Sequence, residues 1–340
     1  MMKAAVCKKP FDIEVEEVPT PSPKPDELLI QVKASAICGS DIKGYQGKHP
    51  LIRLPLILGH EFSGVIIETG SQINGFKTGD RVVVEPSYPC GQCFFCKRME
   101  YYLCKELKQH GHQLAGSFAE YTVARARFTY LLPGTVSFET AALTQPLAIS
   151  LHALHRAGVR KGQTVLILGA GTIGLLLLQV ATQKGAEVAV SDVVDMKLEK
   201  ATSLGARRRF NGSDPKIREA VMEWTRGLGV DVVIEAAGST ATIEQAFSMV
   251  RCGGTILLLG LTGHKKEEIP LEQVTLNELN VLGTMRYAKG DFPSAIETIH
   301  QKKINLDTLI QRRFGLLETP EVFKEILQSP EKVLKSVMVV

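Results

Sequence analysis

The sequence predicts an α/β protein of two domains, and three observations support this fold class. The chain has 340 residues, enough for two domains at the usual size of about 100–200 residues each. From Lys3 to about Ile37, short apolar alternations are broken by prolines, which is typical of a small all-β region. From Thr164 onward, apolar strands alternate with helical stretches, which is typical of a parallel sheet covered by helices.

The composition excludes several classes of function. A hydrophobic content of 44% and a charged content of 22% are ordinary for a globular protein. The formal net charge of +4 gives no reason to expect nucleic acid or an anionic membrane as partner. No apolar run reaches the ~18 residues that a membrane span needs, and Met1–Pro10 lacks the apolar core of a signal peptide. We therefore expect a soluble, cytoplasmic protein.

Four of the seven cysteines form a tight group with the spacing C-x2-C-x2-C-x7-C. They are Cys90, Cys93, Cys96 and Cys104. Four thiolates make a closed tetrahedral shell, which is typical of a structural zinc site, whereas chance clustering of buried cysteines rarely gives this spacing. Cys7 and Cys252 are expected to be small buried apolar residues. His110 and His112 follow this group in what is as readily an exposed loop as anything else, and they receive no role.

A second constellation combines Cys38 in C-G-S-D with His60 and Glu61 in G-H-E. A thiolate, an imidazole and a carboxylate are ligands that zinc takes in open, reactive sites. Adjacent residues of a regular strand point to opposite faces, so His60 and Glu61 reach one ion only if the backbone bends. Ser40 and Asp41 are also common as helix caps, and this alternative stays open.

The stretch Gly59–Ile73 reads G-H-E-F-S-G-V-I-I-E-T-G-S-Q-I and resembles the zinc signature of the medium-chain alcohol and polyol dehydrogenases. The resemblance covers the whole chain. It implies a GroES-like β-barrel catalytic domain with a structural zinc lobe over residues 1–146. It further implies a Rossmann NAD-binding domain with a six-stranded parallel sheet over 147–286, and a return to the catalytic domain over 287–340. The family also implies a homo-dimer or homo-tetramer.

The resemblance assigns roles near the expected catalytic zinc. It implies that the Ser40 hydroxyl passes on the proton of the substrate alcohol and that Asp41 orients the metal ligands. Two residues depart from the family pattern. Lys43 stands where the family has a histidine, and because its reference pKa is about 10.4 we expect the proton to pass directly to water. Gln145 stands where polyol dehydrogenases have a glutamate, and glutamine cannot ionise.

The expected cofactor is NAD. A G-x-G-x-x-G turn follows a strand and opens a helix, and Asp192 lies 18 positions past its last glycine. The turn residues are Gly169, Gly171, Thr172, Ile173 and Gly174. Asp192 should bind the ribose hydroxyls and repel a 2′-phosphate. Further cofactor contacts are expected at Lys197, Gly260, Leu261 and Met285, although a solvated helix charge is an equal alternative for Lys197.

Arg286 and Tyr287 follow the last strand, in a local sequence that resembles the sorbitol-type dehydrogenases. There this pair faces a polar, polyhydroxylated substrate. The prediction is a zinc-dependent enzyme that transfers hydride from a secondary alcohol of a polyol or sugar derivative, which includes sugar phosphates, to NAD. One alternative is a dehydrogenase of the same build that acts on threonine or a simple alcohol. Another is a catalytically silent zinc- and NAD-binding sensor.

Overall fold

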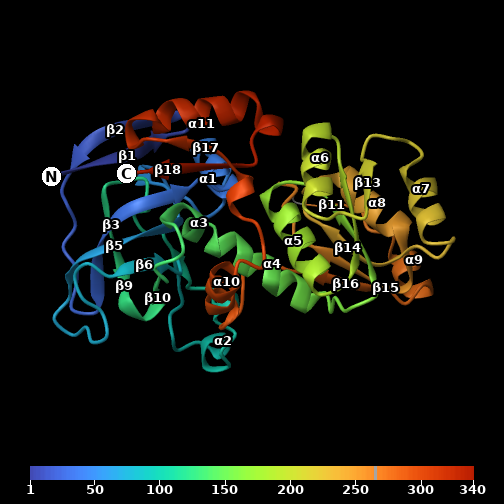
Figure 1. Ribbon diagram of the computed structural model, residues 1–340, viewed down its shortest axis with the longest axis horizontal. Coiled ribbons are helices and arrows are strands. Elements are labelled where there is room, and N and C mark those ends of the chain that lie inside the picture. Colours follow the sequence, from blue (N-terminus) through green and yellow to red (C-terminus); the bar gives the residue numbers. More distant parts are fainter. Residues whose placement is uncertain (264–265) are drawn as a thin grey trace. The chain divides into compact units, whose positions relative to one another are not determined.

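The computed structural model describes residues 1–263 and 266–340, and the chain divides into two compact units. The first unit contains Met1–Gln145 and Ala288–Val340, and the second contains Pro146–Tyr287. The expected domain boundaries differ from this division by one residue at each crossing. Figure 1 shows the red C-terminal strands among the blue N-terminal ones, so both ends of the chain contribute to the first unit.

The first unit is built mainly from β-strands. A three-stranded sheet has the order β2-β1-β4, a two-stranded sheet joins β7 to β8, and a seven-stranded sheet has the order β10-β6-β5-β3-β18-β17 with β9 paired to β3. The bounds are β1 (Met2–Lys9), β2 (Asp12–Val18), β3 (Glu27–Ala36), β4 (Leu56–Ile57), β5 (Glu61–Thr69), β6 (Arg81–Val84), β7 (Ser87–Tyr88), β8 (Lys108–Gln109), β9 (Tyr121–Arg125), β10 (Thr129–Leu131), β17 (Ile310–Phe314) and β18 (Lys335–Val339). The predicted all-β start of the chain is confirmed.

The C-terminal strand β18 lies inside the large sheet of the first unit. It pairs antiparallel with β3 and parallel with β17. Buried side chains from both ends of the chain share one core, including Val32, Phe118, Phe323 and Met338. Because the register places Val337 opposite Ala36, the start of β18 lies beside the segment that carries Cys38.

Short helices complete the first unit. They are α1 (Gly39–Tyr45), α2 (Phe94–Lys97), α3 (Phe138–Ala142), α10 (Asp291–His300) and α11 (Thr319–Gln328), while α4 (Thr144–Arg156) begins at the end of this unit. The helices α3 and α4 are separated at Leu143. Pro146 explains the break, since a proline that lacks its N–H is accommodated in the first turn of a helix and not in the interior.

The second unit is a six-stranded parallel sheet with the order β13-β12-β11-β14-β15-β16. The bounds are β11 (Thr164–Leu168), β12 (Glu187–Asp192), β13 (Arg208–Asn211), β14 (Val230–Glu235), β15 (Val250–Leu258) and β16 (Asn280–Gly283). The predicted sheet is confirmed. The strand order reverses between β11 and β14, and ligands of such sheets bind beyond the carboxyl ends of the strands at this point.

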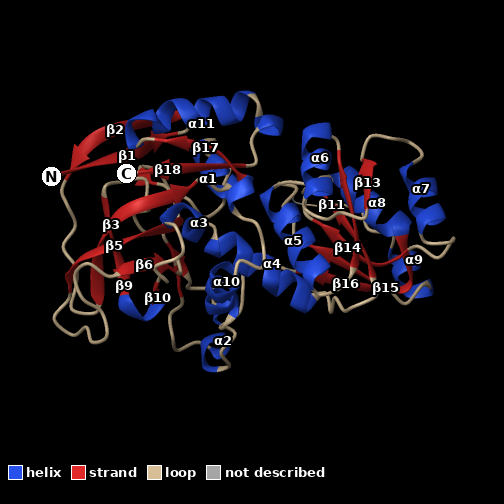
Figure 2. Ribbon diagram, in the orientation of Figure 1, coloured by secondary structure: helices blue, strands red, loops and turns tan. Residues whose placement is uncertain are grey.

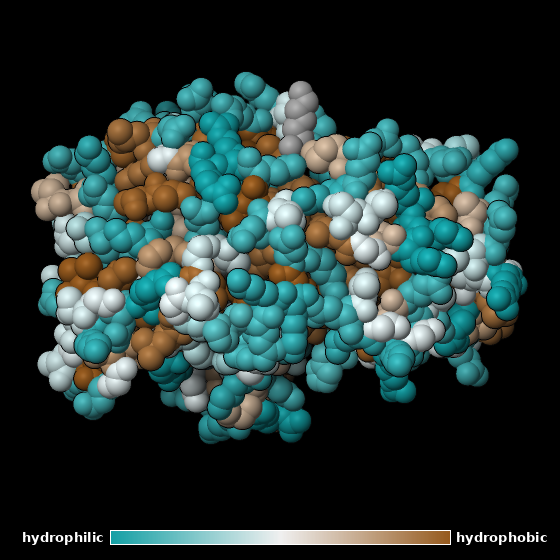
Figure 3. Space-filling view, in the orientation of Figure 1, coloured by the Kyte–Doolittle hydropathy of each residue, from teal (hydrophilic) through white to brown (hydrophobic). Residues whose placement is uncertain are grey.

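Helices flank the parallel sheet on both sides (Figure 2). They are α5 (Thr172–Gln183), α6 (Asp195–Ser203), α7 (Ile217–Trp224), α8 (Thr240–Met249) and α9 (Leu271–Leu276). Apolar residues of α7 and α8 pack against the strands in one cluster that includes Val221 and Phe247. Hydrophilic and apolar residues are mixed on the face drawn in Figure 3. Among the described residues, no helix has the length and apolar character to cross a membrane.

Candidate active site

The segment after β3 prepares one half of the site. Cys38 is the N-cap of α1, and the Asp41 Oδ2 accepts the backbone N–H of Cys38 at 2.8 Å. The other carboxylate oxygen, Oδ1, accepts the backbone N–H of Gly59 at 3.1 Å. Asp41 is fully buried. The helix-cap alternative for Asp41 is therefore observed, and the same carboxylate also ties the Cys38 segment to the G-H-E segment.

The G-H-E segment bends as the sequence required. Gly59 has φ +96°, a left-handed conformation that residues with a Cβ rarely adopt, and β5 begins two residues later at Glu61. His60 and Glu61 are both buried. One ligand atom from each of Cys38, His60 and Glu61 lies within 4.8 Å of the others. The three predicted ligands of the reactive metal therefore come together.

Negatively charged groups around His60 favour a positive charge at this position. Its Nδ1 lies 3.4 Å from the Asp41 Oδ1, and its Nε2 lies 3.5 Å from the Ser40 Oγ. Although burial opposes it, the negative charges of Asp41 and Cys38 raise the pKa of His60 well above its usual value. Since Asp41 faces Nδ1, the Nε2 lone pair is the one left for a metal. The donor set and its charge fit zinc.

A buried lysine that the sequence analysis missed completes this cluster. The Lys335 Nζ lies 2.6 Å from the Glu61 Oε2 and donates a hydrogen bond to the Ile37 carbonyl at 3.0 Å. Burial would lower the pKa of Lys335, but Glu61 and Cys38 raise it above its usual value, so the ammonium stays charged. A lysine within the otherwise apolar C-terminal run was the sequence signal that could have indicated this ion pair.

Two further histidines lie next to the cluster. The His112 ring contacts the His60 ring, with centroids 5.1 Å apart, and also contacts the His49 ring, with centroids 4.6 Å apart. His112 is buried and His49 is half-buried. Gly111 allows the backbone before His112 to pass close to Gly59, because it has no Cβ. A Cβ on Gly111 would lie only 2.7 Å from the Gly59 nitrogen.

His110 is also buried, so the exposed position that was left open as one alternative for these two histidines is excluded. The His110 Nδ1 lies 2.8 Å from the Ala115 carbonyl, which can only accept, so Nδ1 carries the proton. The Tyr88 hydroxyl then donates to Nε2 at 2.8 Å. Burial lowers the pKa of His110 to about 4, and the ring is neutral at physiological pH. His110 therefore has a packing role.

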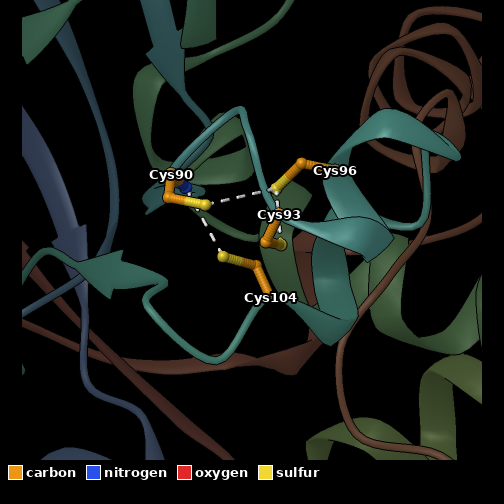
Figure 4. Close-up of side chains that lie close together, drawn as sticks. All are labelled: Cys90, Cys93, Cys96 and Cys104. Atoms are coloured by element: carbon orange, nitrogen blue, oxygen red, sulfur yellow. Dashed lines mark hydrogen bonds between the residues drawn. The ribbon is translucent and has the colours of Figure 1, made fainter.

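The four cysteines of the second group lie close together. Figure 4 shows Cys90, Cys93, Cys96 and Cys104 pointing toward one another. The sulfur separations are 3.9 Å between Cys90 and Cys96 and 3.5 Å between Cys93 and Cys96. Zn–S bonds of about 2.3 Å in a tetrahedron place sulfurs roughly 3.8 Å apart, so the group fits zinc. Backbone N–H groups of Gln92 and Cys93 lower the pKa of Cys90 to about 7, which favours its thiolate.

The G-x-G-x-x-G turn lies between β11 and α5, as predicted. A Cβ on Gly174 would lie 1.9 Å from the Gly169 carbonyl oxygen, so only glycine allows this close packing of helix and turn. Gly171 has open space around the position of a Cβ, which leaves room for a phosphate. Asp192 accepts the backbone N–H of Ala170 at 2.7 Å and of Val194 at 3.0 Å, so its carboxylate is fixed beside the turn.

The structure positions the remaining predicted residues without testing their roles. Gln145 is buried, and its Oε1 has no hydrogen-bond partner among the described residues. Lys43 lies in the last turn of α1, and Lys197 lies in α6. Tyr287 is buried, whereas Leu261 and Met285 are exposed. Cys252 is also exposed, so its predicted burial was wrong, because it lies at the irregular start of β15.

Two family models match the chain. Residues 24–134 match the alcohol dehydrogenase GroES-like domain, and residues 172–301 match the zinc-binding dehydrogenase domain. Together they cover most of the chain: the first lies within the first structural unit, and the second covers most of the second unit and continues into residues 288–301 of the first.

Curated and solved relatives agree with these matches. A sorbitol dehydrogenase of Halalkalibacterium halodurans is 35% identical over 92% of this chain and 92% of its own. A D-arabitol-phosphate dehydrogenase of Enterococcus avium is 34% identical over 93% and 91%. The crystal structure of a proposed zinc-binding dehydrogenase from Sinorhizobium meliloti 1021, bound to NADP, has a TM-score of 0.93 and 33% identity over 100% and 99% of the two chains.

Proposed function

Because the chain belongs to the family of zinc-binding alcohol dehydrogenases, we propose that it oxidises a secondary alcohol of a polyol or sugar derivative and passes the hydride to a nicotinamide cofactor. The observation that carries this proposal is the convergence of Cys38, His60 and Glu61 on one point. These are three donors with a position left open, as in reactive zinc sites.

Two zinc ions per chain are proposed, one at Cys38, His60 and Glu61 and one at the four cysteines of the lobe. At the first site zinc supplies a Lewis acid that lowers the pKa of the substrate hydroxyl. Asp41 holds the His60 ring so that Nε2 faces the metal position. Lys335 holds one Glu61 oxygen and offsets its charge, so the carboxylate is a weaker ligand than an unpaired one.

The Ser40 hydroxyl is the proposed first acceptor of the substrate proton. Its Oγ lies 3.5 Å from the His60 Nε2, so it borders the metal position. The proton would then leave to water, and a nicotinamide cofactor, when bound, would supply the hydride acceptor for the oxidised carbon. Lys43 is close enough for its charge to act on His49, but the proposal requires no proton transfer through it.

NAD is the proposed cofactor. The Asp192 carboxylate is held at the end of β12 by two backbone N–H groups, and a fixed negative charge there opposes the 2′-phosphate of NADP. The Gly169–Gly174 turn would receive the pyrophosphate at the N-terminus of α5. Lys197, Gly260, Leu261 and Met285 are proposed to line the remaining cofactor surface, and Gln145, Arg286 and Tyr287 are proposed to contact the substrate.

The test measures turnover by the zinc-loaded protein for each substrate of a panel, once with NAD and once with NADP. The panel contains hexitols, pentitols, their phosphates, threonine and simple alcohols, and absorbance of the reduced nicotinamide reports turnover. We expect turnover of a polyol or its phosphate with NAD at a higher kcat/KM than with NADP. Faster turnover of threonine or a simple alcohol would replace the substrate assignment and keep the enzyme class.

A catalytically silent sensor is the second candidate, and Gln145 is the observation that favours it. Its buried amide replaces the carboxylate of polyol dehydrogenases. This candidate predicts that the protein binds zinc and NAD, measured by metal analysis and calorimetry, yet turns over no member of the panel. Any zinc-dependent turnover excludes it.

A further inference from the structure

A run of positive charge lies next to the candidate catalytic cluster. Between Asp41 and Glu61 the chain has no acidic residue. The same stretch carries Lys43, Lys48, His49, Arg53 and His60. Residues 43–53 form the basic loop, which leads from the end of α1 toward β4. Clustered positive charge at the edge of a substrate site is a recognition feature, because it selects ligands of opposite sign.

The basic loop is held in a defined conformation. The Lys43 carbonyl accepts the N–H groups of Lys48 at 2.8 Å and His49 at 3.1 Å. The Leu51 carbonyl accepts the Gln113 Nε2 at 3.0 Å, which ties the loop to the residue after His112. The His49 Nδ1 accepts the Leu51 N–H at 3.3 Å, so in the neutral ring the Nε2 carries a proton that can be donated.

The loop is joined to the candidate metal position through a row of rings. His60 contacts His112 at 5.1 Å, and His112 contacts His49 at 4.6 Å. Exposure rises along this row, from buried His60 and His112 to half-buried His49 and exposed Lys48. A linear substrate with its reacting hydroxyl beside His60 can therefore extend past His112 and reach the loop with its far end.

The outer cations of the loop, Lys48 and Arg53, have no acidic partner within the part of the chain that the structure describes. Among the described residues, neither Lys48 nor Arg53 forms an ion pair with a carboxylate, whereas Lys8 pairs with Glu14 at 2.7 Å and Arg98 pairs with Glu100 at 3.3 Å. One terminal nitrogen of Arg53 donates to the Pro50 and Ile52 carbonyls. Its other N–H groups remain available, and a guanidinium presents them in a fork that fits phosphate or carboxylate.

We propose that the basic loop binds an anionic group, a phosphate monoester or a carboxylate, at the end of the polyol chain remote from the reacting hydroxyl. This inference rests on the proposed function and narrows its substrate class. A phosphate dianion gains most, because Lys48, Arg53 and the His49 Nε2–H can donate to its three terminal oxygens together. Arg53 and Lys48 then decide between charged and neutral substrates.

The experiment compares zinc-loaded wild-type protein with the double variant Lys48→Ala/Arg53→Ala. Three substrates of equal chain length are used: a hexitol, the hexitol phosphate and the aldonic acid. We expect wild type to favour one anionic substrate by at least about tenfold in kcat/KM, and the double variant to lose that preference through KM. Turnover of the neutral hexitol should stay within about twofold in the variant, because the loop contributes nothing to its binding. High salt should shrink the preference in wild type alone.

Two further variants sharpen the comparison. Lys77→Ala/Lys303→Ala removes two exposed lysines of the same unit outside the loop and should keep the full preference. His49→Phe keeps a ring against His112 but removes the Nε2–H, and should lower kcat/KM for the anionic substrate by about threefold to tenfold. A preference for phosphate or for carboxylate identifies the source of the charge, and either one supports the anion site.

Equal kcat/KM for all three substrates, or a preference that survives in Lys48→Ala/Arg53→Ala, would overturn the anion site while the proposed function stands. If no substrate turns over, the proposed function fails. Binding of inorganic phosphate, measured by calorimetry on the same zinc-loaded proteins, then decides the inference. Phosphate that binds wild type and not the double variant supports it, and equal binding or none overturns it.

Discussion

The two candidate metal-ligand clusters of the first unit draw their residues from the chain in different ways. Cys90, Cys93, Cys96 and Cys104 lie within fifteen consecutive residues and need only a local loop to converge. The other cluster takes Cys38 from one segment and His60 and Glu61 from another, and Lys335 approaches from a strand 298 residues beyond Ile37. The first cluster offers four sulfur donors, whereas the second offers three donors of different kinds beside the countercharge of Lys335. A local cluster can stabilise a loop by itself, but a reactive one depends on the whole fold of its unit.

Cys38→Ser is expected to give the largest effect. It removes the thiolate from the cluster of Cys38, His60 and Glu61, so metal content should fall from two zinc ions per chain to one. Turnover should fall on the order of 10⁴-fold. The four-cysteine cluster should keep its ion because it shares no ligand with Cys38. Metal analysis and steady-state kinetics measure both. Retained turnover with a single zinc per chain would contradict the assignment of the two clusters.

Cys93→Ser breaks the four-cysteine cluster instead. A structural zinc contributes about 10–16 kcal/mol in isolated fingers, so its loss should unfold the lobe locally. Amide exchange measured by mass spectrometry should rise over residues 90–104 and stay low around Glu61. Cys252→Ser is the matched control, because this exposed cysteine belongs to neither cluster. Global unfolding by Cys93→Ser would show that the lobe is not an independent element.

Lys335→Met tests the countercharge of the cluster of Cys38, His60 and Glu61. It leaves Glu61 buried without its cation, which should destabilise the metal-free protein by about 3–5 kcal/mol. The zinc-bound form should lose less, because zinc then faces the carboxylate alone, and apparent zinc affinity should therefore rise. Chelator competition and denaturant unfolding with and without zinc measure this.

Lys335→Arg keeps the charge and should restore most of the stability. Lys24→Met removes an exposed pair with Glu27 at 3.7 Å and should cost less than about 1 kcal/mol. If Lys335→Met instead weakened zinc binding, Lys335 would be supporting the metal rather than competing for Glu61.

The smallest effect is a pH dependence at His110, which is buried beside the cluster of Cys38, His60 and Glu61 but fully hydrogen-bonded. Its folded pKa of about 4 lies below the unfolded value of about 6.5, so below pH 6.5 the unfolded chain takes up a proton that the folded chain does not. Stability from this group is complete above pH 6.5 and falls as pH drops toward 4, by about 2 kcal/mol at pH 5.

His110→Gln should flatten this dependence, measured by denaturant unfolding between pH 5 and 7.5. Circular dichroism is the suitable probe, because the single tryptophan, Trp224, lies in the other unit. His300→Gln changes an exposed histidine of the same unit and should leave the slope unchanged. An unchanged slope in His110→Gln would mean that other groups dominate the acid sensitivity.

Periodicity and glycine chemistry predicted much of the fold. The all-β start and the six-stranded parallel sheet are confirmed. The sequence pattern predicted burial less well for residues whose surroundings are set by segments far away in the chain. His110 and His112 looked like loop residues, but β5, the backbone at Gly59 and Tyr88 bury them. Cysteine is a residue type that is often buried in protein cores, yet Cys252 is exposed.

The sequence by itself determined the fold class and the family and predicted which residues converge in the two candidate ligand sets, because these depend on local spacing, strand and helix periods, and donor chemistry. Only the tertiary structure decided that Lys335 pairs with Glu61 and that His49 and His112 border the same cluster. Those contacts follow from strand pairing and close backbone approach between distant segments, and no local pattern specifies which distant side chain fills a given buried position.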